Sequence, residues 1–331
     1  MPDLRGVQMD DSLEYPLIVA FPFRHHATHM HSAARQLLTD AGFTIVANDT
    51  GRALSRAEQK AMIRDAYAVV AGTEPYDAEM LEGCDKLRVL IRFGVGTDNF
   101  DLTRLREMGV QVGVIANYNA VAEFTLMLIL SCMKNLPQLD QAVRKGEWAR
   151  FPMCELAGRT VGIVGFGRIG RRLSELLSGF GVRILAYDPF MNEEEAKKRG
   201  VISVGFEELL RESDVVSLHL PATPETEHLI NDKTIAQMKD GAYLVNTARG
   251  KLVDEAALVR ALRAGKLRAA GIDVYEHEPV TTDNPLFELN NVSVTPHTAA
   301  ITFETNYNGA FTAAQSVLNV LNGGRPVYPV I

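Results

Sequence analysis

The chain has 331 residues, 47% of them hydrophobic and 23% charged, which is typical of a globular protein with room for two domains. Its formal net charge of −7 gives no electrostatic reason to expect nucleic acid or an anionic membrane as a partner. The three cysteines, Cys84, Cys132 and Cys154, lack CxxC spacing, so we expect reduced thiols in a cytoplasmic protein and no metal site.

Short β-rich runs alternate with helical patterns along nearly the whole chain, which predicts parallel sheets built from βαβ units. The first series occupies about residues 15–115, with a helix expected at 31–41. Its strands are expected at 17–21, 44–47, 68–71, 88–92 and 110–114. A long apolar helix is expected at 120–134.

The segment 138–158 differs in character because it carries the only tryptophan, Trp148. We expect it to be either a subunit-contact arm or a surface loop. A second βαβ series begins at Thr160, and the chain closes with a helix at 303–322. The expected strands of this series are 161–164, 183–187, 215–218, 243–245, 269–273 and 292–294, with helices at 169–178 and 255–264.

A glycine motif, Gly165-x-Gly167-x-x-Gly170, directly follows the strand expected at 161–164 and opens a helical pattern. In a dinucleotide-binding turn, the first glycine permits the tight bend and the second lets the backbone approach a pyrophosphate. The third lets helix and strand pack closely. Asp188 ends the next strand, where its carboxylate would accept hydrogen bonds from ribose hydroxyls and repel a 2′-phosphate. This pattern predicts a site for NAD in preference to NADP.

Three later segments each lie where an expected strand ends, at the edge of an open α/β sheet that binds ligands. Arg249 follows the strand 243–245, and its guanidinium would grip a carboxylate and a carbonyl oxygen. His297 follows the strand 292–294 and suits the role of acid and base in alcohol oxidation. Glu278, fixed by the following proline, is the carboxylate expected to favour the imidazolium. Glu276 is the competing carboxylate, but it should face outward.

These segments resemble those of the D-isomer-specific 2-hydroxyacid dehydrogenase family, most of all its phosphoglycerate dehydrogenase-like members. The resemblance runs from about residue 65 to the end and rests on the glycine motif, Thr-Ala-Arg-Gly, Asp-Val-Tyr-x-x-Glu-Pro and Thr-Pro-His. It implies an NAD-dependent enzyme with Arg249, Glu278 and His297 as catalytic residues. The cofactor-binding residues that it implies, beside the three glycines and Asp188, are Arg168, Ile169, Leu220, Thr247, Asp273 and Ala300.

The same resemblance implies two Rossmann-like domains, with a cofactor domain at 118–298 inserted into a flavodoxin-like substrate domain at 1–117 and 299–331. Residues 138–158 would then be a homodimer-contact arm. Val95 and Gly96 would bind the substrate carboxylate through their N–H groups. Arg92 is similar to an arginine that phosphoglycerate dehydrogenases direct at the substrate phosphate. The resemblance therefore favours D-3-phosphoglycerate as the substrate.

Two other functions use the same residues: a glyoxylate or hydroxypyruvate reductase, and a non-enzymatic NAD-sensing corepressor of this family. A panel of 2-oxo acids would separate them. Half of the eight histidines lie in 25–31, where His25 and His29 have the i, i+4 spacing of metal ligands on a helix. Without an acidic or cysteine ligand nearby, we expect a loop that borders the substrate and no metal site.

Overall fold

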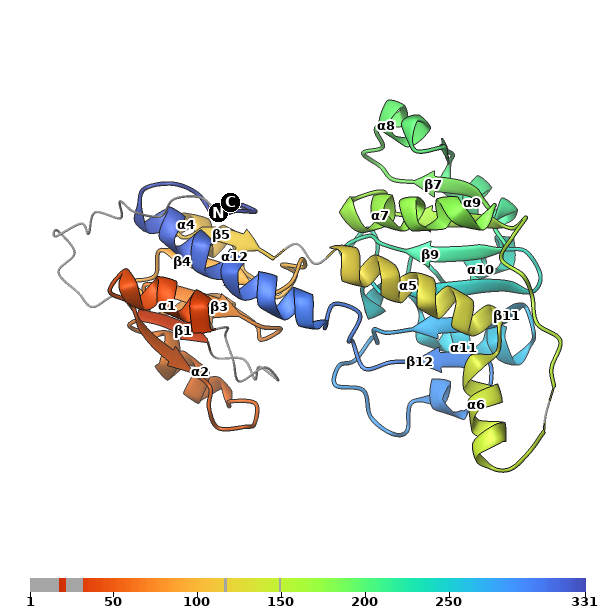
Figure 1. Ribbon diagram of the computed structural model, residues 1–331, viewed down its shortest axis with the longest axis horizontal. Coiled ribbons are helices and arrows are strands. Elements are labelled where there is room, and N and C mark those ends of the chain that lie inside the picture. The colour runs from red at the N-terminus through yellow and green to blue at the C-terminus, as the bar shows by residue number, and fades with distance from the viewer. Residues whose placement is uncertain (1–17, 22–31, 116–117, 149) are drawn as a thin grey trace. The chain divides into compact units, whose positions relative to one another are not determined.

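The computed structural model describes residues 18–21, 32–115, 118–148 and 150–331, and these fall into two compact units (Figure 1). Unit 1 comprises Met1–Asn117 and Ile301–Ile331, and unit 2 comprises Tyr118–Ala300. Unit 2 is therefore inserted into unit 1 along the sequence. Its second boundary lies two residues beyond the expected one. The histidine cluster at 25–31 lies outside the described residues.

Unit 1 contains a five-stranded parallel sheet in the order β2-β1-β3-β4-β5, which is flavodoxin-like. Its strands are β1 (Ile18–Phe21), β2 (Thr44–Ala47), β3 (Ala68–Ala71), β4 (Val89–Arg92) and β5 (Gln111–Val114). One face is covered by α1 (Ser32–Asp40) and α12 (Phe303–Leu321), which share a core with it. The other face packs on α2 (Arg56–Ile63), α3 (Ala78–Leu81) and α4 (Leu102–Glu107).

Unit 2 contains a seven-stranded parallel sheet in the order β12-β11-β10-β9-β6-β7-β8. Its centre has the Rossmann order, with the switch point between β6 and β9. The strands are β6 (Thr160–Val164), β7 (Arg183–Tyr187), β8 (Val201–Ser203), β9 (Val215–Leu218), β10 (Ala242–Asn246), β11 (Leu267–Ile272) and β12 (Val292–Val294). All of these strands except β8 were expected from the sequence. The strand β8 was missed because it has only three residues, two of them exposed. The two-domain α/β fold is confirmed.

Helices cover both faces of the unit 2 sheet. One face packs on α5 (Tyr118–Met133), α7 (Arg168–Leu177) and α8 (Glu193–Lys198). The other packs on α9 (Phe206–Glu212), α10 (Asp232–Gln237) and α11 (Glu255–Arg263). Short 3-10 turns occur at η1 (Ser178–Phe180), η2 (Gly250–Leu252) and η3 (Pro285–Glu288). A further helix, α6 (Leu136–Arg144), occupies the first part of the segment in which we expected an arm or a loop.

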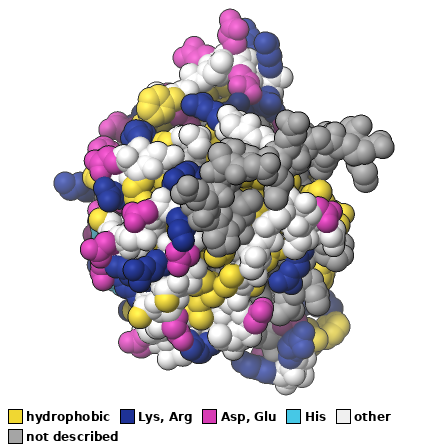
Figure 2. Space-filling view, turned by 90° about the vertical axis from the view of Figure 1, so that its left-hand side faces the viewer, with side chains coloured by type: hydrophobic (Ala, Val, Ile, Leu, Met, Phe, Trp, Pro, Cys, Tyr) yellow, Lys and Arg dark blue, Asp and Glu magenta, His cyan; other side chains and the backbone are white. Residues whose placement is uncertain are grey.

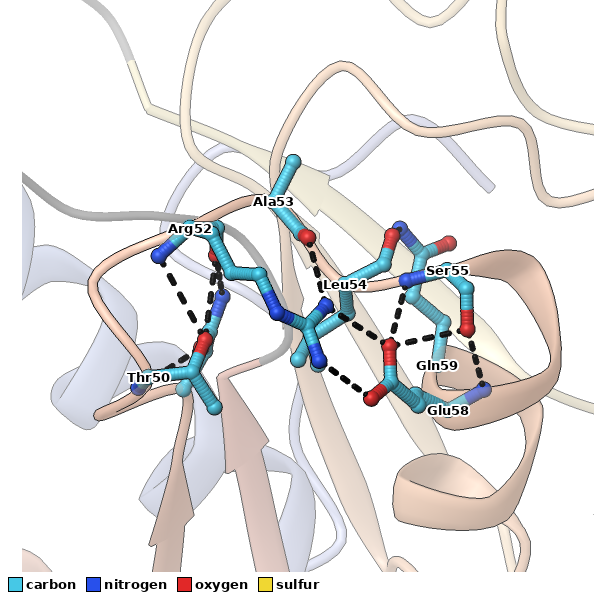
Figure 3. A network of polar contacts seen from close by, with 8 residues as sticks. Thr50, Arg52, Ala53, Leu54, Ser55, Glu58 and Gln59 are labelled. Atoms are coloured by element: carbon cyan, nitrogen blue, oxygen red, sulfur yellow. Dashed lines mark hydrogen bonds and ion pairs between the residues drawn. The ribbon is translucent and has the colours of Figure 1, made fainter.

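Several helices of this chain begin at a residue whose side chain caps the first turn, and α2 illustrates how (Figure 3). The N–H and hydroxyl of Ser55 donate to Glu58 Oε2 at 2.7 and 2.8 Å, and the Glu58 N–H donates back to the Ser55 hydroxyl. Arg52 forms a bidentate ion pair with the same carboxylate. The capping box satisfies helix N–H groups that have no partner within the helix.

Positive and negative side chains are interspersed on the face shown in Figure 2, over its described residues. This agrees with the absence of a strong charge bias in the sequence. Among the described helices, none is by itself both long and apolar enough to cross a membrane. The pair α5 and α6, bent by 65°, passes such a test only when taken together.

Candidate active site

The turn after β6 is shaped by its glycines. Gly165 has φ +99°, and a Cβ there would lie 2.6 Å from the carbonyl carbon of His219. A Cβ on Gly170 would lie 2.3 Å from the Gly165 oxygen. Gly167 begins α7 without a side-chain cap, and no atom lies within 4 Å of its Cβ position. The open helix N-terminus beside this turn fits a pyrophosphate.

Asp188 follows β7 and reaches back to the glycine turn. Its Oδ2 accepts from the Phe166 N–H at 2.7 Å, and its Oδ1 accepts from the Phe190 N–H at 2.8 Å. Each carboxylate oxygen has a second lone pair for a ribose hydroxyl. The sequence did not indicate these backbone contacts, which hold the carboxylate at the edge of the turn.

The other residues implied for the cofactor lie around this same edge of the unit 2 sheet. Arg168 and Ile169 form the first turn of α7, and Leu220 follows β9 just beyond the His219 carbonyl that contacts Gly165. Thr247 follows β10 and is buried, with its hydroxyl 2.7 Å from that of Thr125. Thr125 donates to the Val121 carbonyl, so Thr247 donates to Thr125. Ala300 is the last residue of unit 2.

Arg249 lies in the turn between β10 and η2 and is half-buried. Asn246 braces this turn, since its side-chain oxygen accepts from the Ala248 N–H and its amide donates to the Arg249 carbonyl. Gly250 brings the turn against the next segment: a Cβ there would lie 1.9 Å from both the carbonyl carbon and the oxygen of Tyr275. Only glycine allows these backbones to meet.

Asp273 is fully buried after β11 and organises the loop that carries His297. Its Oδ1 accepts from the Thr295 hydroxyl at 2.6 Å and the Thr298 N–H at 2.9 Å, and its Oδ2 accepts from the Ala299 N–H at 3.0 Å. Its carbonyl accepts from the His297 N–H at 2.7 Å. The sequence did not predict this loop-ordering role.

Glu278 and His297 meet at the edge of the sheet, as the sequence predicted. His297 Nδ1 lies 2.6 Å from Glu278 Oε2, and Glu278 Oε1 accepts from the Tyr275 N–H at 3.0 Å. Burial alone would raise the pKa of Glu278, but the hydrogen bond and charge of His297 outweigh it and lower that pKa. His297 has φ +51°, an uncommon conformation for a residue other than glycine. The carboxylate holds Nδ1, so Nε2 is the nitrogen left to exchange a proton.

The competing carboxylate has a different partner. Glu276 pairs with His228, and its N–H donates to Glu255 Oε1 at 2.7 Å. Glu255 Oε2 accepts from the Asn284 amide at 2.9 Å. Glu255 and Gly250 thus both lie against the segment 275–278. We did not predict Glu255 as a site residue from the sequence, although the helix expected at 255–264 begins with it.

His219 and His277 do not join the pair. His219 is buried beside Ser217, whose hydroxyl lies 2.9 Å from its Nε2, and burial lowers the pKa of His219 to about 3. His277 is exposed, and so is Glu278, so exposure does not alternate between these two neighbours.

Arg92, Val95 and Gly96 lie together in unit 1, at the carboxyl edge of its sheet. Arg92 is only 9% exposed, and its guanidinium donates to the carbonyls of Gly96 at 3.1 Å and Phe93 at 3.0 Å. Val95 is 39% exposed, and no described group accepts a hydrogen bond from the N–H of Val95 or Gly96. This loop offers two N–H groups to an anion.

Comparison with known proteins places the chain in a family. Residues 126–299 match the family described as D-isomer specific 2-hydroxyacid dehydrogenase, NAD binding domain. A D-3-phosphoglycerate dehydrogenase of Archaeoglobus fulgidus is 41% identical over 259 residues, 77% of this chain and 49% of that protein. A glyoxylate reductase of Korarchaeum cryptofilum is 41% identical over 275 residues, 80% of this chain and 82% of that protein.

Solved structures agree. TT0316 protein of Thermus thermophilus has a TM-score of 0.85 at 33% identity, covering 95% of this chain and 99% of that one. A D-lactate dehydrogenase of Aquifex aeolicus, complexed with NAD and lactic acid, has a TM-score of 0.79 at 31% identity, covering 92% and 96%. The chain spans about half of the phosphoglycerate dehydrogenase it matches. From the matched domain and these relatives, the chain belongs to the D-isomer-specific 2-hydroxyacid dehydrogenase family.

Proposed function

We propose that this protein is an NAD-dependent D-2-hydroxyacid dehydrogenase, which transfers a hydride reversibly between NAD(H) and a 2-hydroxy or 2-oxo acid. The observation that carries the proposal is the Glu278–His297 pair, 2.6 Å apart, at the same edge of the unit 2 sheet as the glycine turn. An acid-base pair beside a dinucleotide turn is what the oxidation of an alcohol requires.

Three residues of unit 2 have different roles in the proposed reaction. The nicotinamide cofactor, when bound, supplies or accepts the hydride at C2 of the acid. His297 Nε2 gives a proton to the carbonyl oxygen during reduction and takes it back during oxidation. Glu278 stabilises the imidazolium and holds the ring. Arg249 orients the substrate carboxylate and polarises the carbonyl, as a guanidinium does well.

The cofactor is held at the glycine turn. The open N-terminus of α7 receives the pyrophosphate, and Asp188 accepts from the adenosine ribose. In this proposal Arg168, Ile169, Leu220, Thr247 and Ala300 line the same edge. Asp273 contacts the nicotinamide carboxamide through the one lone pair, on Oδ2, that its loop contacts leave unused. A native preference for NADPH over NADH would contradict the role of Asp188.

Two substrates within this class are candidates. Arg92 and the phosphoglycerate dehydrogenase relatives support D-3-phosphoglycerate, and Val95 and Gly96 would bind its carboxylate. The glyoxylate reductases, which match over about four fifths of their length, support a small unphosphorylated acid.

The test is steady-state turnover of a panel of 2-oxo acids with NADH and NADPH. His297→Ala should lower kcat by about 10²–10⁴-fold, because it removes the acid-base group, while NADH binding measured by fluorescence stays nearly native. Undiminished turnover in that variant would refute the assignment. Tight NADH binding without turnover of any acid would favour an NAD-sensing protein that is not an enzyme.

The segment 138–158 is proposed to form a homodimer contact in a cytoplasmic protein. Large apolar side chains are exposed along it, with Trp148 the most exposed at 80%; the others are Val143, Phe151 and Met153. An apolar surface rich in aromatic and methionine side chains is typical of an interface. Gel filtration with light scattering should show a dimer that Val143→Glu weakens. A native monomer would refute this part of the proposal.

A further inference from the structure

Two loops of unit 1 are joined at the carboxyl edge of its sheet. One follows β3 and contains Glu74, and the other follows β4 and contains Val95 and Gly96. Asn99 ties them, because its amide donates to the carbonyls of Glu74 at 2.6 Å and Gly72 at 3.3 Å. The Tyr76 N–H donates to the Asn99 carbonyl at 2.7 Å, and the rings of Tyr76 and Phe100 stack edge to face. These contacts therefore join the two loops into one surface.

Arg92 contributes to this surface mainly by shaping it. Its neighbour across the sheet is Ala71, three residues before Glu74. The guanidinium folds over Gly94, where a Cβ would lie 3.2 Å from Nη1, and it donates to two carbonyls of its own loop. Because Arg92 is only 9% exposed and its guanidinium donates to carbonyls of its own loop, it presents little of its charge to a ligand.

The Glu74 carboxylate is the unusual group beside it. Its Oε2 is buried and has no hydrogen-bond partner among the described residues. Burial raises the pKa of Glu74, an effect opposed by nearby backbone N–H groups and by the charge of Arg92. A buried carboxylate oxygen without a donor is costly, so a donor on a bound molecule would stabilise the complex.

We propose that Glu74 is a specificity-determining residue. It offsets the charge of Arg92, rejects 2-oxo acids that carry a second anionic group, and accepts a hydrogen bond from acids that carry a hydroxyl. This inference rests on the proposed dehydrogenase activity and narrows its substrate to an unphosphorylated short acid. Near Arg92, the positive charge that would attract a phosphate is offset by Glu74. The negative Glu74 carboxylate would also repel the phosphate, so binding a phosphorylated acid is unfavourable.

The experiment compares two acids that differ only in the phosphate, hydroxypyruvate and 3-phosphohydroxypyruvate, with NADH and the full chain. The native protein should show a kcat/KM at least about tenfold higher for hydroxypyruvate. Glu74→Gln should reduce this ratio about tenfold by improving turnover of the phosphorylated acid. Glu74→Asp keeps the charge and should retain the native preference.

A native preference for 3-phosphohydroxypyruvate would overturn the inference and leave the dehydrogenase activity standing; this comparison needs no variant to fold. If a folded Glu74→Gln protein keeps the native ratio of kcat/KM for the two acids, the proposed role of Glu74 is overturned as well. If neither these acids nor glyoxylate is turned over, the proposed activity fails and the specificity role falls with it.

Discussion

The Glu278→Gln substitution tests the acid-base pair most directly. Glutamine keeps the size of the side chain and can still accept from the Tyr275 N–H through its oxygen. Its amide nitrogen then faces His297 Nδ1 at the position of Oε2, 2.6 Å away in the native protein. Two donors would oppose each other there unless the imidazole changes tautomer, which moves its proton to Nε2.

The size of the effect follows from the geometry. Two unit charges about 4 Å apart interact by about 1 kcal/mol in water and about 4 kcal/mol at an effective dielectric constant of 20. The His297 and Glu278 side chains are 38% and 33% exposed, so screening is substantial. We take about 1.4 kcal/mol for the pair after screening, which corresponds to about a factor of ten in an equilibrium constant.

The direction in which the pH profile of kcat should move follows from the charge of Glu278. The pKa of Glu278 is lowered, so its carboxylate is already ionised at a pH below its ordinary pKa. Its stabilisation of the imidazolium is lost only when the pH falls through this lowered pKa. Glu278 therefore stays ionised across neutral and alkaline pH in the native protein. Reduction needs the imidazolium, so loss of the carboxylate should move the alkaline limb of the kcat profile about one unit lower.

The assay is kcat for a 2-oxo acid as a function of pH, with NADH saturating. We expect Glu278→Gln to lower kcat about 10- to 100-fold, less than removal of the histidine itself. Glu276→Gln is the matched control: it removes a carboxylate two residues away that pairs with His228. An alkaline limb that stays in place, with kcat within a factor of two of native, would show that Glu278 does not stabilise the imidazolium.

Three further predictions concern how the site is held. Gly250→Ala should lower both stability and kcat, because its Cβ would lie 1.9 Å from the Tyr275 backbone; native values in thermal unfolding and turnover would contradict this. Asp273→Asn should lower the free energy of unfolding in urea by about 2–4 kcal/mol, because one amide cannot accept from three donors, and a loss under about 0.5 kcal/mol would speak against it. Glu255→Ala should lower kcat about tenfold with NADH affinity unchanged, and Glu255→Gln, which keeps an acceptor for Glu276, should recover most of it; equal kcat in both would show that the residue does not position Glu278.

Much of the fold could be read from the sequence because its signals are local. The alternation of β-branched runs with helical patterns located 11 of the 12 strands in the described part of the chain, and it missed β8, whose three residues show no clear period. The helix α6 was missed for a different reason. Its apolar residues Leu136, Leu139, Ala142 and Val143 do recur at helical spacing, but the single tryptophan that follows led us to interpret the segment as an arm or a loop.

At the site, the residue types that stand at strand ends could be predicted from the sequence: the three glycines, Asp188, Arg249, Glu278 and His297. Their positions follow from spacing, because the carboxyl ends of parallel strands share one edge.

Which of these groups touch depends on the three-dimensional fold. Glu276 meets His228 while Glu278 meets His297, and Asp273 orders the histidine loop. Arg92 is engaged by its own loop, and Glu74 keeps an oxygen without a partner among the described residues. The physical reason is that contacts between side chains far apart in sequence depend on loop conformation and packing, which no local period encodes.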